Sequence, residues 1–323
     1  MRRDLPPAVR LGGFAALLTA VLAGAYGVGA AAAPAVSPPA PSPEHPAHKA
    51  TAASSGPVAS AGLLPGLSVS QDGWTLRPVS DVLPVGSAVP FAFRITGPDG
   101  EPLTTYSRTH ERDLHLVAVR RDLTAFQHVH PTLQDGVWTV PLDLSAPGSY
   151  RVFADFAPAG GAGVTLGADV SVGGTFSPVP LPAPAAAVVV DGYEVSLSGA
   201  TPAVGETELV FTVRRDGRPA RLEPYLGAFG HLVALRVGDL AYLHTHPGQD
   251  AAPGETGGPD VSFATVFPTA GSYRLHLDFQ VDGRVHTAAF TVAVPEPPPA
   301  GPGDAAPPGS SEPADHAATP HEH

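Results

Sequence analysis

An internal repeat is the sequence feature that most constrains the fold of this chain. The segment 114–131 (LHLVAVRRDLTAFQHVHP) aligns without gaps to the segment 230–247 (GHLVALRVGDLAYLHTHP). Farther along, Gly-Ser-Tyr-Arg occurs at 148–151 and again at 271–274. Two copies of so long a unit indicate a tandem duplication, so we expect two domains of one fold.

Both copies read as β-strands. Short runs alternate apolar and polar residues, and Gly, Pro or Asp interrupts them every roughly 8–12 residues, as in sandwiches and barrels. Examples are 88–96, 136–142 and 150–156 in the first copy and 208–213, 231–237 and 273–279 in the second. We expect an all-β protein with two tandem Ig-like β-sandwich domains after an N-terminal apolar helix. Tyr150 and Tyr273 resemble the corner tyrosine of Greek-key sandwiches, a structural role.

Proline-rich stretches set the expected domain boundaries. The 323 residues include 36 Gly and 39 Pro, and the prolines are concentrated outside the two copies. Segments of that composition are typically extended or disordered. We therefore expect six parts: a signal peptide or transmembrane anchor (1–33), a disordered Pro-rich linker (34–65), a first β-sandwich (66–173), a second Pro-rich linker (174–187), a second β-sandwich (188–294) and a disordered tail (295–323).

The N-terminus is expected to direct export. Arg2, Arg3 and Arg10 precede an apolar run over 11–33. Positive residues before such a run indicate a secretory signal, and the run is also long enough to span a bilayer. A membrane anchor and a cleaved signal both stay open. In either case we expect the rest of the chain on the extracytoplasmic face of the cell membrane, or secreted.

Composition excludes several classes of function. The net charge is −12, with 18 Lys and Arg, which is unsuited to nucleic acid. The chain has no Cys, and Met1 is its one methionine, so thiolate zinc sites, iron–sulfur clusters and thioether Cu(I) sites are excluded. Among soft or borderline metal ligands, the 14 histidines remain.

Six of these histidines form two equally spaced trios. His115, His128 and His130 recur as His231, His244 and His246, with spacings of 13 and 2. Residues two apart on a strand share a face. Centring a hairpin turn on Gly238-Asp239 places His231 opposite His246, and the same register places His115 opposite His130. Each trio would then converge on one patch.

The trios share sequence parity with apolar residues, so we expect them to face the sandwich interior. A buried cluster of neutral imidazoles suits Cu(II) or Zn(II). Asp155 and Asp278 are the candidates for a fourth ligand or a carboxylate that orients a histidine, and His110 and Glu111 are weaker candidates. The alternative is a hydrogen-bonded histidine cluster that caps a core. His45, His48, His316, His321 and His323 lie in the expected disordered segments.

The chain resembles a group of actinobacterial exported proteins described as secreted or heavy-metal-binding. The segments that carry the resemblance are 110–115 (HERDLH), 126–131 (FQHVHP) and 225–231 (YLGAFGH). It covers most of 66–294 and the N-terminal apolar segment. The resemblance implies an envelope protein of paired Ig-like domains, and it implies no reaction.

We therefore expect a binding protein and not an enzyme. The expected function is Cu(II) or Zn(II) buffering or delivery, one site per domain, with other envelope metal-handling proteins as partners. The alternative is a structural or adhesion pair of sandwiches whose histidines only pack. The Glu that cupins carry after their His-x-His is missing here, as are Ser-His-Asp, phosphate-loop and His-Glu-x-x-His motifs.

Overall fold

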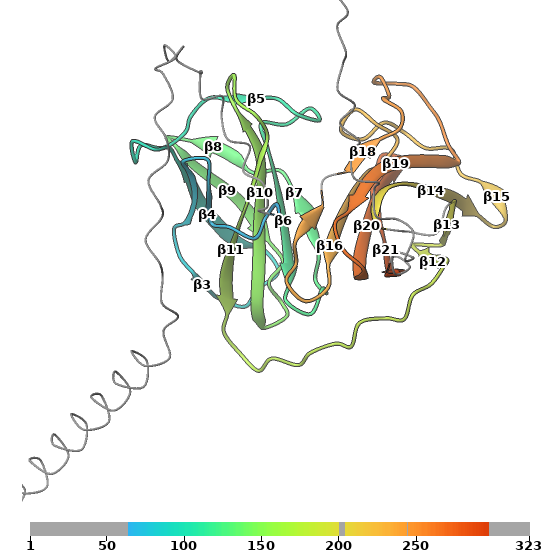
Figure 1. The fold of residues 1–323 in the computed structure, drawn as a ribbon, viewed down its shortest axis with the longest axis horizontal. Coiled ribbons are helices and arrows are strands. Elements are labelled where there is room, and N and C mark those ends of the chain that lie inside the picture. Colours follow the sequence, from blue (N-terminus) through green and yellow to red (C-terminus); the bar gives the residue numbers. More distant parts are fainter. Residues whose placement is uncertain (1–63, 200–203, 244, 297–323) are drawn as a thin grey trace, which may run out of the picture. The chain divides into compact units, whose positions relative to one another are not determined.

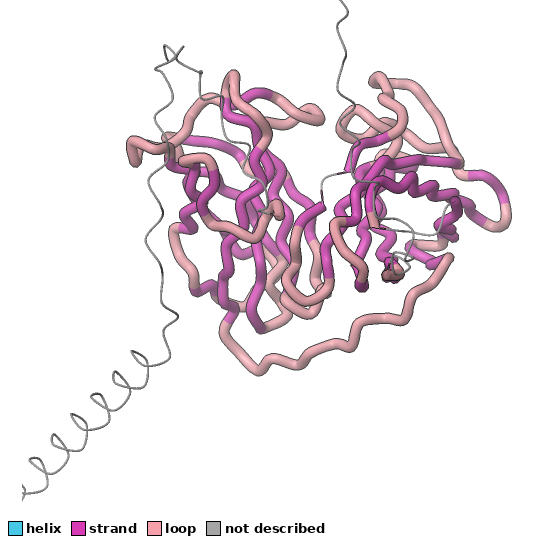
Figure 2. The backbone as a smooth tube through the Cα atoms, in the orientation of Figure 1, coloured by secondary structure: helices cyan, strands magenta, loops and turns pink. Residues whose placement is uncertain are grey.

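The computed structural model describes residues 64–199, 204–243 and 245–296. All of them belong to one compact unit, Ala59–His323. These residues form strands and loops without a helix (Figure 2), as the all-β prediction required. Within them, therefore, no helix has the length and apolarity to cross a membrane. The expected N-terminal helix, the linker before residue 64 and His244 lie outside the described residues.

The first block of sequence forms two sheets, shown in blue to green in Figure 1. One sheet has the strand order β1 (Ser70–Gln71), β2 (Trp74–Pro78), β4 (Val89–Thr96), β9 (Val137–Leu142) and β8 (Thr132–Gln134). The other has the order β3 (Val82–Leu83), β11 (Val164–Val172), β10 (Gly148–Pro158), β6 (Leu114–Arg120) and β7 (Gln127–Val129), and β5 (Tyr106–Ser107) pairs with β10.

The second block repeats this plan. Its first sheet has the order β12 (Ala187–Val190), β13 (Tyr193–Gly199), β14 (Gly205–Arg215), β19 (Asp260–Phe267) and β18 (Thr245–Pro247), with β15 (Arg218–Pro219) on β14. Its second sheet has the order β17 (Tyr242–Leu243), β16 (His231–Arg236), β20 (Gly271–Val281) and β21 (Arg284–Val294). The prediction of two Ig-like β-sandwich domains is confirmed.

The corner tyrosines take the role expected of them. The Tyr150 hydroxyl donates to the Ala146 carbonyl at 2.8 Å, and Tyr273 donates to the Thr269 carbonyl at 2.8 Å. Both rings are fully buried. Each hydroxyl therefore ties the start of β10 or β20 to the corner that precedes it.

Alternating side chains along β6 and β16 enter two different cores. Leu116 and Ala118 point into the core of the first sandwich, whereas Val117 and Val119 belong to a separate buried cluster. On β16, Val233 and Leu235 join that same cluster. All seven residues of β6 are buried, which is typical of a strand covered on both faces.

This third cluster lies between the two sandwiches. Its eight buried members come from both of them: Val117, Val119, Leu123, Phe153, Val233, Leu235, Leu240 and Tyr242. The first histidine trio and His231 share the parity of these residues and lie at this layer. The expectation that they face the interior of their own sandwich is wrong, because each of these sheets has a second apolar face covered by the other block.

Candidate metal centre

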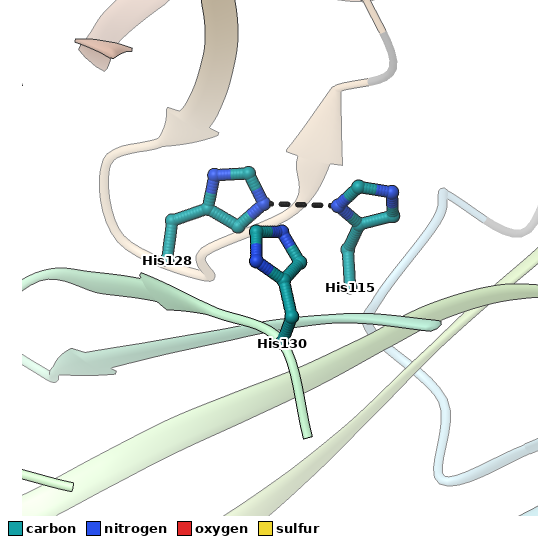
Figure 3. A group of neighbouring side chains, drawn as sticks. All are labelled: His115, His128 and His130. Atoms are coloured by element: carbon teal, nitrogen blue, oxygen red, sulfur yellow. Dashed lines mark hydrogen bonds between the residues drawn. The ribbon is translucent and has the colours of Figure 1, made fainter. Parts of the chain in front are cut away.

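The β6–β7 hairpin brings the first histidine trio together. The pairs Leu116 with Val129 and Val117 with His128 have the predicted register, and just beyond the last pair the ring centroids of His115 and His130 lie 5.0 Å apart. One nitrogen from each of the three rings lies within 4.8 Å of the other two. The rings of His115, His128 and His130 turn toward a common space (Figure 3), and His115 Nδ1 lies 3.2 Å from His128 Nε2.

Hydrogen-bond acceptors on either side fix the protons of these two rings. The Thr109 carbonyl lies 3.0 Å from His115 Nε2, and a carboxylate oxygen of Asp278 lies 2.8 Å from His128 Nδ1. Because a carbonyl and an ionised carboxylate only accept, each of those nitrogens carries a proton. In their neutral forms the two rings therefore turn lone pairs toward each other across 3.2 Å. That arrangement is favourable only with a proton or a cation between them.

The third ring has an unused nitrogen. His130 Nε2 is buried and has no hydrogen-bond partner among the described residues. A buried polar group without a partner costs about 1–3 kcal/mol, so such a group in a native protein calls for an explanation. A bound metal ion would supply the missing partner.

The second sandwich contributes to the same cluster. The ring centroid of His231, the first residue of β16, lies 5.9 Å from those of His115 and His128 and 4.9 Å from that of His110. The nearest acceptor to His231 Nε2 is the Leu226 carbonyl at 3.4 Å, a long contact. The cluster is thus built from both copies of the repeat.

The two aspartates occupy equivalent positions. Asp155 pairs with His115 across β10 and β6, and Asp278 pairs with His231 across β20 and β16. A threonine on the next strand donates to each carboxylate: Thr165 to Asp155 at 3.0 Å and Thr287 to Asp278 at 2.6 Å. The duplication therefore supplies one positioned carboxylate from each sandwich, and Asp278 uses its second oxygen on His128.

A small cavity lies among these groups. Its volume is about 20 Å³, and its walls include His110, His115, His128, Asp155 and His231. A volume of that size accommodates one water molecule or one ion.

Burial keeps His115, His130 and His231 neutral. Burial, assisted by repulsion from His128, lowers the pKa of His115 to about 2. The same two causes lower the pKa of His130 and of His231 to about 3. A neutral imidazole is the form that binds metal, so protons compete weakly at these three sites at neutral pH.

One nitrogen pair has the spacing of two ligands of a tetrahedral ion. Metal–nitrogen bonds of ~2.0–2.1 Å place two tetrahedral ligands about 3.3 Å apart. The 3.2 Å between His115 Nδ1 and His128 Nε2 is close to that value. The His130 nitrogen lies at most 4.8 Å away and would have to move by up to about 1.5 Å to reach the same spacing.

The second trio does not form a matching group among the described residues. His231 lies with the first trio, and His246 is exposed on β18, where its strand pairs with β19 of the other sheet. The β16–β17 pairing keeps the predicted register but ends at Leu243. Beyond it, Thr245 donates to the Leu232 carbonyl and the chain crosses to the other sheet, earlier than in the first block. The structure thus shows one shared cluster where the sequence predicts two.

The cluster includes one residue that the sequence predicts only as a weaker candidate, His110, and one that it does not predict, Tyr225. The ring of His110 contacts those of His115 and His231, although it has no counterpart in the second copy. Tyr225 was not identified, and its ring lies 6.4 Å from that of His130 and 6.2 Å from that of His231. Burial and the nearby Asp278 raise the pKa of Tyr225 to about 12. The sequence signal for this contact is the presence of apolar residues on both faces of β6 and β16, which indicates that the two sandwiches pack against each other.

The chain belongs to the family described as "Domain of unknown function (DUF8832)", which matches it twice, over residues 68–174 and 187–296. The two matches correspond to the two copies of the repeat. No curated protein matches the chain in sequence.

Among solved structures, the chain is similar to domains 4 and 5 of the S-layer protein SbsC, with 9% identity and a TM-score of 0.22 over 70% of this chain and 98% of that one. It is also similar to the Escherichia coli adhesin FdeC, with 17% identity and a TM-score of 0.23 over 70% of this chain and 66% of that one. A Salmonella alpha-2-macroglobulin mutant shows 15% identity and a TM-score of 0.24 over 72% of this chain and 15% of that one.

Proposed function

We propose that this member of the DUF8832 family binds one divalent transition metal ion, Zn(II) or Cu(II), at His115, His128 and His130. The observation that carries the proposal is the 3.2 Å separation of His115 Nδ1 and His128 Nε2, which both carry lone pairs when the two rings are neutral. The orphaned nitrogen of His130 supports it independently. A cation at this point would satisfy all three nitrogens at once.

The environment supports Zn(II) as the better fit of the two metals. Cis ligands of a tetragonal Cu(II) ion with bonds of ~2.0–2.1 Å lie about 2.9 Å apart, whereas tetrahedral ligands lie about 3.3 Å apart. The 3.2 Å separation is nearer the second value. Asp278 would act as the outer carboxylate that orients His128, a common arrangement around zinc-bound histidine.

The proposed place of action is the extracytoplasmic face of the cell membrane. The positive residues before the apolar run at 11–33 support export, either with a retained anchor or with a cleaved signal. There the protein would buffer the metal or deliver it to other envelope metal-handling proteins. The buried cluster supports holding and passing on an ion rather than catalysis, since its cavity of about 20 Å³ admits no larger reactant.

A second candidate function is that of a structural or adhesion pair of Ig-like modules. The apolar layer between the sandwiches and the hydrogen bond from His128 to Asp278 favour it, because both give the histidine cluster a packing role without a metal. The two candidates differ in one measurable respect. The metal-binding protein is stabilised by its ion, and the purely structural pair is not.

Thermal unfolding of the full chain with and without Zn(II) tests the proposal. An ion present at 100 times its Kd stabilises the native state by about 2.7 kcal/mol, so Tm should rise. His130→Ala should abolish the rise, since it removes a nitrogen that has no other partner. His246→Ala, at an exposed position of β18, is the matched control and should keep the full rise. An equal Tm with and without metal in the wild-type chain would reject the proposal in favour of the structural pair.

A further inference from the structure

The coordination of the proposed ion is incomplete with three nitrogens. Closed structural sites have four protein ligands, whereas sites that act on a small molecule keep one position open. Which of these the centre resembles depends on the nearest additional donor. The answer rests on the proposed function, since it concerns the same ion.

His231 is the donor best placed to complete the set. It borders the same small cavity as His115 and His128. Its ring is nearly parallel to that of His115, at an interplanar angle of 22° and a centroid distance of 5.9 Å. The contact of its Nε2 with the Leu226 carbonyl is long, at 3.4 Å, so little is lost when the ring turns toward an ion.

The four nitrogens would come from both sandwiches. His115, His128 and His130 belong to the β6–β7 hairpin of the first, and His231 opens β16 of the second. Asp278 on β20 already joins the second sandwich to His128. An ion bound by all four imidazoles would therefore link the two sandwiches directly.

The layer between the sandwiches is the weakest of the three cores. It contains eight buried apolar residues, against 22 in the core of the first sandwich and 24 in that of the second. Hydrophobic stabilisation grows with the apolar area buried, so the contact between the sandwiches should open before either core does. An ion that binds only the closed arrangement would stabilise that arrangement selectively.

We propose that His231 supplies the fourth nitrogen and that the ion acts as a staple between the two modules, so that metal loading converts a hinged pair of sandwiches into a rigid one. The stiffness of this extracytoplasmic segment would then depend on the metal supply. The centre is on this account a closed, regulatory metal site and has no open position for a substrate.

Hydrogen–deuterium exchange of the full chain, with and without Zn(II), together with calorimetric titration, tests this inference. In the wild-type chain the ion should slow exchange on both facing strands, β6 and β16. His231→Ala should still bind Zn(II), with affinity lower by roughly 10–100-fold, and should lose the metal-induced protection of β16 while keeping that of β6. His231→Gln, which retains a polar side chain of similar reach, should behave in the same way and controls for a packing defect. His246→Ala should match the wild type in both measurements.

The outcomes separate this inference from the proposed function. Zn(II) binding in the wild-type chain without protection of β16, or full protection of β16 in His231→Ala and His231→Gln, would overturn the staple and leave metal binding intact. Absence of Zn(II) binding in the wild-type chain would overturn both.

Discussion

His128 on one sandwich and Asp278 on the other form a buried hydrogen-bonded pair, with His128 Nδ1 2.8 Å from a carboxylate oxygen and both side chains 4% exposed. The two residues are 150 positions apart in the chain. The pair ties the candidate metal ligand of one module to a carboxylate of the other. It therefore couples the orientation of the ligand to the contact between the modules.

Asp278→Asn should weaken metal binding and destabilise the protein together. The amide cannot hold the proton of His128 on Nδ1 as the carboxylate does, so Nε2 would be presented less often as a ligand. We expect Zn(II) affinity to fall roughly 10–100-fold, as for other outer carboxylates of zinc-bound histidine. A hydrogen bond to a charged group contributes about 1.5–3 kcal/mol and a neutral one about 1 kcal/mol, so the free energy of unfolding of the metal-free chain should fall by about 0.5–2 kcal/mol in urea unfolding.

Asp191→Asn is the matched control for that variant. Asp191 also accepts from a histidine, His286 Nδ1, at 2.8 Å, but its side chain is 41% exposed and it lies outside the cluster. Calorimetry should give the wild-type affinity for Zn(II). An equal loss of affinity in both variants would show that the effect of Asp278→Asn is not specific to the centre.

Stability should decrease as the pH is lowered from about 6.5 toward 3. The pKa values of His115, His130, His231 and His276 are lowered to between about 2 and about 3, chiefly by burial. In the unfolded chain their pKa values return to 6.5, the ordinary value for histidine, so between the two values the unfolded state binds more protons. The free energy of unfolding then falls with falling pH, by roughly 1.4 kcal/mol per pH unit for each such histidine.

Urea unfolding across this pH range checks the expectation. His276→Phe should reduce the slope by the share of one histidine, because it removes a titrating group while keeping a ring stacked on Phe126, whose centroid lies 3.8 Å away. A free energy of unfolding that does not change between pH 6.5 and 4 would contradict the buried, neutral state of the cluster.

Gly66 should be intolerant of a side chain. Its φ is +73°, and a Cβ there would lie 2.6 Å from a ring carbon of Phe153 and 3.0 Å from the Cβ of Tyr242. Both neighbours belong to the layer between the sandwiches. We expect Gly66→Ala to lower the free energy of unfolding by backbone strain plus about 1–3 kcal/mol of overpacking.

Gly100→Ala isolates the strain contribution. Gly100 has a φ of +84°, yet a Cβ there would meet no atom within 4 Å. It should therefore be the milder of the two substitutions in urea unfolding. Equal losses in the two variants would indicate that the layer between the sandwiches accommodates the added methyl group.

The sequence predicts the local part of the centre and fails on the long-range part. Strand alternation and hairpin register depend on neighbouring residues, and they correctly place His128 opposite Val117 and bring His130 near His115. The position of His246 depends instead on where the chain crosses from one sheet to the other. In the second block β17 begins at Tyr242, which aligns with Phe126 of the first block, and it ends at Leu243. In the first block β7 continues to Val129, three positions beyond Phe126.

The repeat pattern also does not predict that both copies contribute to one centre. A duplicated sequence predicts two equal sites, but it does not say which faces the two copies bury against each other. Only the apolar residues on both faces of β6 carry that information, and they identify a covered face without naming the covering partner. The link between His231 and the first trio follows from this packing and not from any spacing in the sequence.

Anomalous diffraction at the zinc edge, from crystals of the full chain grown with Zn(II), tests the central claim most directly. The account predicts a peak within ~2.0–2.1 Å of nitrogens of His115, His128 and His130. Anomalous density confined to other histidines of the chain, with none between these three rings, would contradict it.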